Sequence, residues 1–261
     1  MTRRLPRLTA DELARAIAGD ALVTRYQPKV RLSDRAPVGV ETLARLRHPR
    51  LGLVGPEQFV PLAEEAGLAP MLTAAVTRRA VADIAALREE GLVLTVALNF
   101  PLEILALPDI PDNLAREVAD AGLSPADVIV ELTETQARDE LDDVRRVTQA
   151  LIAQGFGVSL DDFGLGGAPH RHLHSLHFTE MKLDQSLVLG ALSDPGLAQA
   201  LDSAVAIGRA MALTVVAEGV ETPEVWDMLR DRPVDQAQGW LVGRPMLAEE
   251  LGDWVAAWMA G

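Results

Sequence analysis

The chain has 261 residues, 49% of them hydrophobic and 24% charged, so we expect one large domain over residues 1–261 with a sizeable core. Its formal net charge of −14 repels a phosphate backbone, so no nucleic-acid polymer is expected as a partner. The absence of cysteine excludes disulfides, thiolate metal ligands and cysteine nucleophiles. No apolar run is long enough to span a membrane, and none follows the basic start, so we expect a cytoplasmic protein without membrane insertion.

Apolar, β-branched runs alternate along the chain with amphipathic stretches. Strands are expected at Leu22–Gln27, Val38–Leu43, Leu92–Leu98, Val128–Leu132, Gly157–Leu160, Glu180–Leu183, Leu213–Ala217 and Val234–Ala237. Helices are expected at Ala10–Ala18, Pro70–Glu90, Asp112–Ala121, Asp139–Gln154, Leu197–Met211 and Pro223–Arg230. Thr9 and Glu12 have the spacing of a capping box at the first of these helices. This alternation predicts an α/β fold, a (β/α)8 TIM barrel.

The first two strands depart from the ideal barrel. Only Val30–Gly39 joins them, with Asp34 and Pro37 inside the link. A parallel crossover needs a dozen or more residues and usually a helix. We therefore predict a modified barrel in which the first strand runs antiparallel to its neighbour.

Polar side chains stand near the carboxyl end of seven predicted strands: Glu41, Asn99, Glu131, the pair Asp161 and Asp162, Lys182, Glu218 and Gln238. In a barrel these ends line one mouth, where active sites lie. Chance polar residues at strand ends are the alternative, and for a single member such as Gln238 that alternative is strong. Several carboxylates with one lysine among them would be costly to bury without cations.

Carboxylates and one amide form an all-oxygen ligand set, which suits Mg²⁺ or Mn²⁺ rather than zinc. A shared carboxylate can bridge two ions about 3.5–4 Å apart, an arrangement that suits phosphoryl displacement. Lys182 is placed to orient the attacking water or to stabilise charge on phosphate oxygens. The residues thus predict a two-metal site, in which Ca²⁺ is expected to inhibit because its coordination is looser.

The segment Glu41-Thr42-Leu43-Ala44-Arg45 resembles the signature of the EAL-domain cyclic di-GMP phosphodiesterases, with Thr in place of Ala. Further matches run in the family's order from about Ala21 to Leu247: Tyr26-Gln27-Pro28-Lys29, Pro56–Glu64, Asn99, Glu131-Leu132-Thr133-Glu134, Asp161-Asp162-Phe163-Gly164, Lys182-Leu183-Asp184, Ala217–Glu221, Gln238-Gly239 and Arg244-Pro245. Each motif alone is weak, but their joint order and spacing are specific.

The resemblance implies a role for each matching residue. Glu41, Asn99, Glu131 and Asp161 would hold one metal ion, while Asp161, Asp162 and Glu218 would hold the second. Lys182 would act on the attacking water, with Glu218 and Gln238 in the same catalytic network. Gln27, Arg45 and Glu221 would contact the substrate, and Glu134 would anchor the loop after Asp162. Cyclic di-GMP would be opened to linear pGpG, and family members are commonly homodimers joined near that loop.

The chain departs from the family after Asp162-Phe163-Gly164, where the usual Thr-Gly-Tyr-Ser-Ser is replaced by Leu165-Gly166-Gly167-Ala168-Pro169. Hydroxyl groups that would pin the loop are therefore missing. This favours the alternative of a catalytically weak or inactive cyclic di-GMP receptor, whereas the intact ligand set favours the enzyme. A barrel that acts only through its surface is a third hypothesis, and it predicts no nucleotide binding.

Two residue groups carry an alternative interpretation. Four of the five histidines lie in 170–177, which is typical either of a metal or pH-sensing site or, as we prefer, of a solvated or dimer-facing helix. Trp226, Trp254 and Trp258 are expected to pack in the core or at an interface. Trp240, just after Gln238-Gly239, is the tryptophan expected near the barrel mouth.

Overall fold

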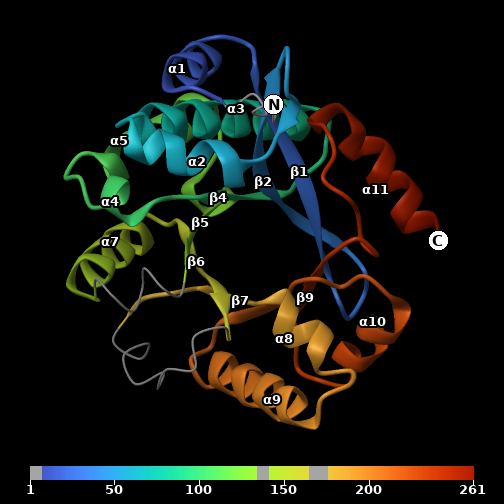
Figure 1. The fold of residues 1–261 in the computed structure, drawn as a ribbon. Coiled ribbons are helices and arrows are strands. Elements are labelled where there is room, and N and C mark those ends of the chain that lie inside the picture. The colour runs from blue at the N-terminus through green and yellow to red at the C-terminus, as the bar shows by residue number, and fades with distance from the viewer. Residues whose placement is uncertain (1–7, 134–140, 165–175) are drawn as a thin grey trace, which may run out of the picture.

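The computed structural model describes residues 8–133, 141–164 and 176–261 (Figure 1). The described strands form one sheet: β1 (Leu22–Arg31), β2 (Pro37–His48), β3 (Gly52–Val54), β4 (Thr95–Asn99), β5 (Val128–Thr133), β6 (Gly157–Phe163), β7 (Glu180–Leu183), β8 (Thr214–Ala217) and β9 (Gln236–Gln238). The described α-helices are α1 (Ala10–Ala18), α2 (Pro56–Glu65), α3 (Ala69–Glu89), α4 (Leu102–Leu105), α5 (Ile110–Asp120), α7 (Leu141–Ala153), α8 (Gln185–Gly190), α9 (Pro195–Ala210), α10 (Pro223–Arg230) and α11 (Leu251–Ala260).

Eight of the strands close into a barrel. Their order is β1-β9-β8-β7-β6-β5-β4-β2, and a further pairing of β1 with β2 completes the ring, while β3 extends β2. The helices surround the strands in Figure 1. The predicted α/β barrel is therefore confirmed. Seven of the eight predicted strands, from β2 through β4 to β9, run parallel to one another.

The first strand runs against its neighbours, as the short link predicted. β1 pairs antiparallel with β2 over a long register from Leu22↔Leu46 to Val30↔Pro37, and antiparallel with β9 through Lys29↔Gln238. The turn between β1 and β2 contains Arg35 in the left-handed region, with φ of 63°. A tight hairpin of this kind leaves no room for a crossover helix.

Side-chain caps fix where several helices begin. The Thr9 hydroxyl accepts a hydrogen bond from the Glu12 backbone, and the Glu12 carboxylate accepts one from Thr9, so the predicted capping box of α1 is confirmed. Thr222 caps α10 by accepting a hydrogen bond from the Val225 backbone, and Pro223 is the first residue of the helix. Asp184 caps α8 by accepting from Ser186, which fixes the chain just after β7.

Two apolar clusters hold the molecule together. The larger lies between the barrel strands and the helices α3 to α11, and the smaller lies under α1 and α2, around Leu13, Leu46 and Phe59. Within the described ranges, none of the helices combines the length and apolar character that crossing a bilayer would require.

Candidate active site

Lys182 stands at the centre of a ring of carboxylates inside the barrel. Its Nζ lies 3.2 Å from Glu41 Oε2, 3.2 Å from Glu131 Oε1, 3.1 Å from Asp161 Oδ1 and 2.7 Å from Glu218 Oε1. These side chains come from β2, β5, β6 and the end of β8, and the Lys182 side chain is 1% exposed. The residues predicted at the strand ends therefore meet in space, as barrel geometry requires.

An irregularity in β6 turns both adjacent aspartates toward this cluster. Successive side chains of a regular strand point to opposite faces, so Asp161 and Asp162 would normally diverge. The register with β7 shifts between Leu160 and Phe163, and Asp162 takes the left-handed conformation with φ of 58°. The Asp162 backbone N–H also donates to Asp161 Oδ1 at 3.0 Å.

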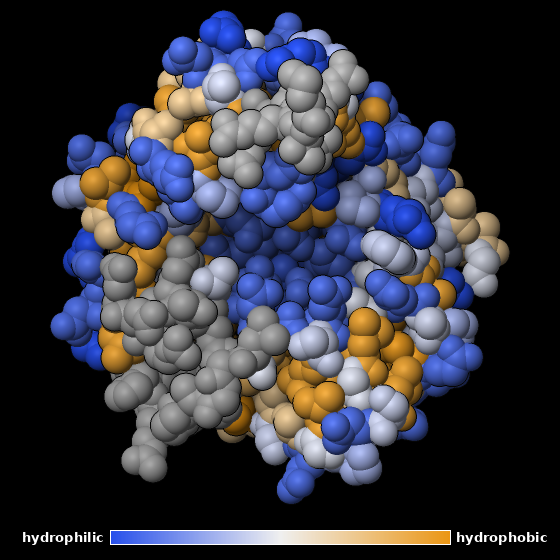
Figure 2. Space-filling view, in the orientation of Figure 1, coloured by the Kyte–Doolittle hydropathy of each residue, from blue (hydrophilic) through white to orange (hydrophobic). Residues whose placement is uncertain are grey.

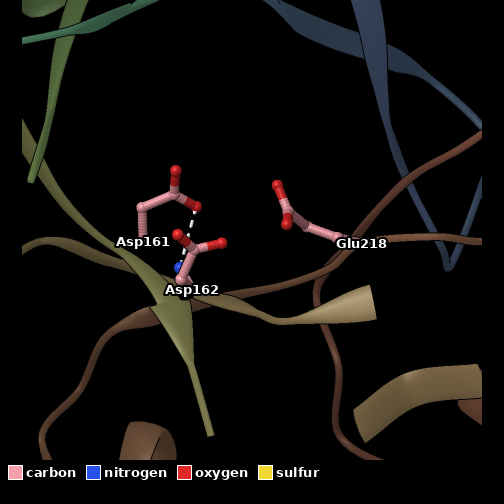
Figure 3. Close-up of side chains that lie close together, drawn as sticks. All are labelled: Asp161, Asp162 and Glu218. Carbon is pink, nitrogen blue, oxygen red and sulfur yellow. Dashed lines mark hydrogen bonds between the residues drawn. The ribbon is translucent and has the colours of Figure 1, made fainter. Parts of the chain in front are cut away.

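The result is a set of three oxygen ligands within reach of one another. Carboxylate oxygens of Asp161, Asp162 and Glu218 lie within 4.8 Å of one another. Figure 3 shows Asp161 and Asp162 side by side on β6, with Glu218 facing them across the gap.

Glu41 is held in one orientation by two amides. Gln238 Nε2 donates to Glu41 Oε2 at 2.6 Å, and Asn99 Nδ2 donates to Glu41 Oε1 at 3.2 Å. Gln238 Nε2 also lies 3.3 Å from Gln27 Oε1, which links β9 to β1 across the same site. Burial raises the pKa of Glu41, but Lys182 and these two amides lower it by more than burial raises it. The pKa therefore lies below its ordinary value.

The pKa values of Glu131, Asp162 and Glu218 shift in the opposite direction. Burial raises the pKa of Glu131 well above its ordinary value, and repulsion from Glu41 and Asp161 adds to this despite Lys182. Burial together with Asp161 raises the pKa of Glu218 to about 7, and the same two causes raise the pKa of Asp162. Burial lowers the pKa of Lys182, but the surrounding carboxylates raise it well above its ordinary value.

The donor set fits divalent cations. Glu41, Glu131, Asp161, Asp162 and Glu218 supply five carboxylates against the single ammonium of Lys182. Both carboxylate oxygens of Glu131 are buried and accept no hydrogen bond from the residues that the structure describes. Oxygen ligands with excess negative charge suit a hard metal such as Mg²⁺ or Mn²⁺.

A pocket of about 270 Å³ opens beside this cluster. It is lined by Gln27, Glu41, Leu43, Gln185, Glu218, Gly219, Glu221, Gln238, Gly239 and Trp240. Figure 2 shows a hydrophilic hollow in the middle of the molecule, in the same orientation as Figure 1. Trp240 is 53% exposed, and the Arg244 guanidinium carbon lies 4.3 Å from the centre of the Trp240 ring.

The predicted substrate contacts divide into two groups. Gln27 and Glu221 line the pocket, together with Trp240, the tryptophan predicted near the mouth. Arg45 is absent from that lining, and its guanidinium donates to the Ala44 carbonyl at 2.8 Å. Glu134, the predicted loop anchor, and residues 165–175 lie outside the described residues, as do His170, His172 and His174.

Sequence reasoning missed Gln185, and it named Asp184 only as part of the match Lys182-Leu183-Asp184, without a role. Gln185 lines the pocket, and Asp184 caps α8. Burial and the charge of Asp161 are the two largest causes of the raised pKa of Asp162, and the charge of Asp184 adds to them. Their position directly after Lys182-Leu183 was the available signal. The other tryptophans pack against the core, as predicted. Trp254 also stacks on Trp258, and Trp226 lies edge-on to Trp258.

The fold and the site together define a family. The EAL domain family matches residues 10–245, nearly the whole described barrel, so the chain belongs to the EAL domain family. The resemblance inferred from the motifs is thereby confirmed.

Among similar proteins is the bifunctional diguanylate cyclase/cyclic di-GMP phosphodiesterase MucR of Pseudomonas aeruginosa, 34% identical over 92% of this chain and 35% of MucR. The cyclic di-GMP phosphodiesterase NbdA of the same organism is 33% identical over 95% of this chain and 32% of NbdA. The chain thus spans about a third of the length of these relatives. A solved structure of the MucR phosphodiesterase in complex with c-di-GMP is 34% identical, with a TM-score of 0.87 over 92% of this chain and 98% of that one.

Proposed function

We propose that this chain is a metal-dependent phosphodiesterase that hydrolyses cyclic di-GMP to linear pGpG. The observation that carries the proposal is the cluster of five carboxylates around Lys182 beside a polar pocket, in a chain of the EAL domain family. Relatives such as MucR and NbdA are named as cyclic di-GMP phosphodiesterases, which supports the same substrate here. In this reaction the water oxygen bonds to one phosphorus, the bond from that phosphorus to the 3′ oxygen breaks, and the 3′ oxygen takes a proton, so the linear product keeps a 5′ phosphate.

Two divalent cations, Mg²⁺ or Mn²⁺, are the proposed cofactors. Glu41, Asn99, Glu131 and Asp161 would hold one ion, while Asp161, Asp162 and Glu218 would hold the other. When bound, such cations acidify water and neutralise charge on the phosphate oxygens. The described ligand oxygens support this assignment, because they converge and carry negative charge that Lys182 alone does not balance.

The chain's own residues would position the reactants. Lys182, kept protonated by the carboxylates around it, would donate a hydrogen bond to the attacking water or to a phosphate oxygen. Gln238 and Asn99 would hold the Glu41 carboxylate in place through their amide hydrogen bonds. Gln27 and Glu221 would contact the dinucleotide from the pocket wall, and Arg45 is the proposed partner of a phosphate.

The test is product formation by the wild type and by Glu41→Ala. Each is incubated with cyclic di-GMP and Mn²⁺, and the products are separated by chromatography. We expect linear pGpG from the wild type and none from Glu41→Ala. Tight cyclic di-GMP binding without product from either protein would favour the receptor hypothesis, which the altered sequence Leu165–Pro169 supports. No binding at all would favour a barrel that acts only through its surface.

We further propose that residues 1–261 act as one domain in the cytoplasm and that the protein forms a homodimer. The interface is proposed near residues 163–178, which mostly lie outside the described residues. His177 is exposed in the part of this segment that the structure describes, which is compatible with a solvated or dimer-facing surface.

A further inference from the structure

A second ion pair lies inside the barrel. Lys29 Nζ of β1 donates a hydrogen bond to Glu180 Oε1 of β7 at 3.2 Å, and the two side chains are 0% and 4% exposed. In the barrel order β9 and β8 separate β1 from β7, so this contact runs through the interior and not along the sheet. Burying two charges in this way is costly unless their mutual attraction and further hydrogen bonds offset the loss of hydration.

The strand register places the pair next to Glu131. Glu131 of β5 is opposite Ser159 of β6, and Ser159 is opposite Glu180 of β7. Side chains opposite one another in a sheet share a face, and Glu180 shares its face of β7 with Lys182, two residues further on. Lys29 is likewise two residues from Gln27, which lines the pocket, and opposite Gln238. The pair therefore occupies the layer of the interior just behind the site.

Glu131 is an obvious alternative partner for the Lys29 ammonium. Its carboxylate is buried and accepts no hydrogen bond from described residues, and its one ion-pair partner there, Lys182, also contacts three other carboxylates. After burial and Lys182, the charge of Lys29 is among the influences on the pKa of Glu131, and it lowers that pKa. Lysine has a flexible four-carbon stem, which can redirect the ammonium to a new acceptor.

We propose that Glu180 is a positioning residue that holds the Lys29 ammonium and thereby keeps the Glu131 carboxylate free to bind a divalent cation. This inference rests on the proposed function, because it takes Glu131 as a metal ligand. Without the Glu180 carboxylate, Lys29 turns to Glu131, and an incoming cation must displace an ammonium from its own ligand.

The test is Mn²⁺ binding in the absence of nucleotide, measured by electron paramagnetic resonance of free Mn²⁺. Glu180→Gln removes the charge that holds Lys29, and we expect Mn²⁺ affinity to fall about 10–100-fold, the usual effect of losing a residue that orients a metal ligand. The double variant Lys29→Met/Glu180→Gln also removes the competing ammonium, so we expect its affinity to return to near the wild-type value. A purely structural ion pair predicts no such recovery.

Two further variants make the test decisive. Glu180→Asp keeps the charge but withdraws the carboxylate, so it is the variant to measure if Glu180→Gln does not fold, and we expect it to bind Mn²⁺ more weakly than the wild type. Asp127→Asn is the matched control, because Asp127 pairs with Arg88 just before β5 begins, at the opposite end of that strand from Glu131. Its Mn²⁺ affinity should equal that of the wild type.

The outcomes separate this inference from the proposed function. Wild-type binding with unchanged affinity in Glu180→Gln or Glu180→Asp overturns the inference alone. So does a double variant that binds no better than Glu180→Gln. A wild type that binds no Mn²⁺ overturns both the metal site and this inference.

Discussion

At the scale of single residues, the ion pairs that Lys182 makes with the buried carboxylates offset part of the repulsion among them. One ammonium contacts four carboxylates, at distances between 2.7 and 3.2 Å, deep in the barrel. These groups repel one another, as the raised pKa values of Glu131 and Glu218 show after burial is taken into account. Lys182 is therefore expected to stabilise the folded protein, in addition to its proposed role in hydrolysis.

Lys182→Met should make the metal-free protein markedly less stable. Removing one partner of a buried ion pair leaves uncompensated charge, which typically costs about 3–5 kcal/mol of unfolding free energy. The measurement is urea denaturation in the presence of a chelator. Arg230→Met is the control, because Arg230 forms an exposed pair with Asp227 and should contribute about 0–1 kcal/mol. Equal stability of Lys182→Met and the control would contradict this role.

The sequence predicted which carboxylates meet around Lys182, but not how they pair. Polar side chains at the ends of parallel strands were enough to predict that Glu41, Glu131, Asp161 and Glu218 meet. The Lys182–Glu131 and Lys29–Glu180 ion pairs depend on which strands face one another across the barrel. That arrangement follows from the register of every strand in the ring, which local patterns do not determine.

At the scale of elements, close packing at the pocket restricts the loop that carries Glu218 and the end of β9, which carries Gln238. The Val220 backbone N–H donates to the Gln238 carbonyl at 3.0 Å, so the loop after β8 is fixed to the end of β9. A Cβ at Gly239 would lie 2.2 Å from the Val220 carbonyl oxygen and 2.3 Å from its nitrogen. Backbone atoms at such distances cannot yield without moving the loop.

Gly239→Ala should therefore destabilise the protein, by about 1–3 kcal/mol as expected for overpacking. Gly252→Ala is the matched control, because no atom lies within 4 Å of its added Cβ and the residue is in α11. That control should be more stable by about 0.5–1 kcal/mol, since alanine favours helix. Thermal or urea denaturation compares the two variants, and a Gly239→Ala protein as stable as the control would refute the packing argument.

The cap of α1 gives a pH-dependent contribution to stability. Hydrogen bonds from the Thr9 backbone and hydroxyl, with Arg50 nearby, lower the pKa of Glu12 from 4.5 to about 2. A carboxylate with a lowered pKa stabilises the fold above its unfolded pKa and loses that contribution as the pH falls from 4.5 to 2. The urea midpoints of wild type and Glu12→Ala should thus differ at pH 7 and converge toward pH 2. A difference between the two urea midpoints that stays constant down to pH 2 would contradict this role of the Glu12 carboxylate.

Element prediction succeeded where patterns were long and failed where they were short. All eight predicted barrel strands are present, although β4 begins at Thr95 and not at Leu92. The three-residue strand β3 carries too short a pattern to predict, and α2 contains Pro61, which ordinarily breaks a helix. The short helices α4 and α8 lie between strands and leave no clear period of their own.

At the scale of the whole molecule, assembly is the first property to test. We expect a homodimer in sedimentation velocity at tens of micromolar with ligand present. A monomer under these conditions would contradict the prediction. Loss of the dimer between pH 7.5 and 5.5 in the wild type but not in His174→Ala would instead favour the pH-sensing interpretation of the histidines.

Metal selectivity is the second property of the intact protein. The site is expected to work with Mg²⁺ or Mn²⁺ and to be inhibited by Ca²⁺, which takes more ligands at longer distances in looser geometry. Pre-incubation with Ca²⁺ should lower pGpG formation at fixed Mn²⁺ concentration. Activity in Ca²⁺ alone equal to that in Mn²⁺ would show that the ligand set does not discriminate in this way.

The central claim is that these carboxylates catalyse hydrolysis by binding divalent cations. Its most direct test follows pGpG formation from cyclic di-GMP by the wild type through exhaustive chelation and subsequent addition of Mg²⁺ or Mn²⁺. Product formation should stop on chelation and resume when either ion is restored. Full hydrolytic activity in the chelated protein would contradict it.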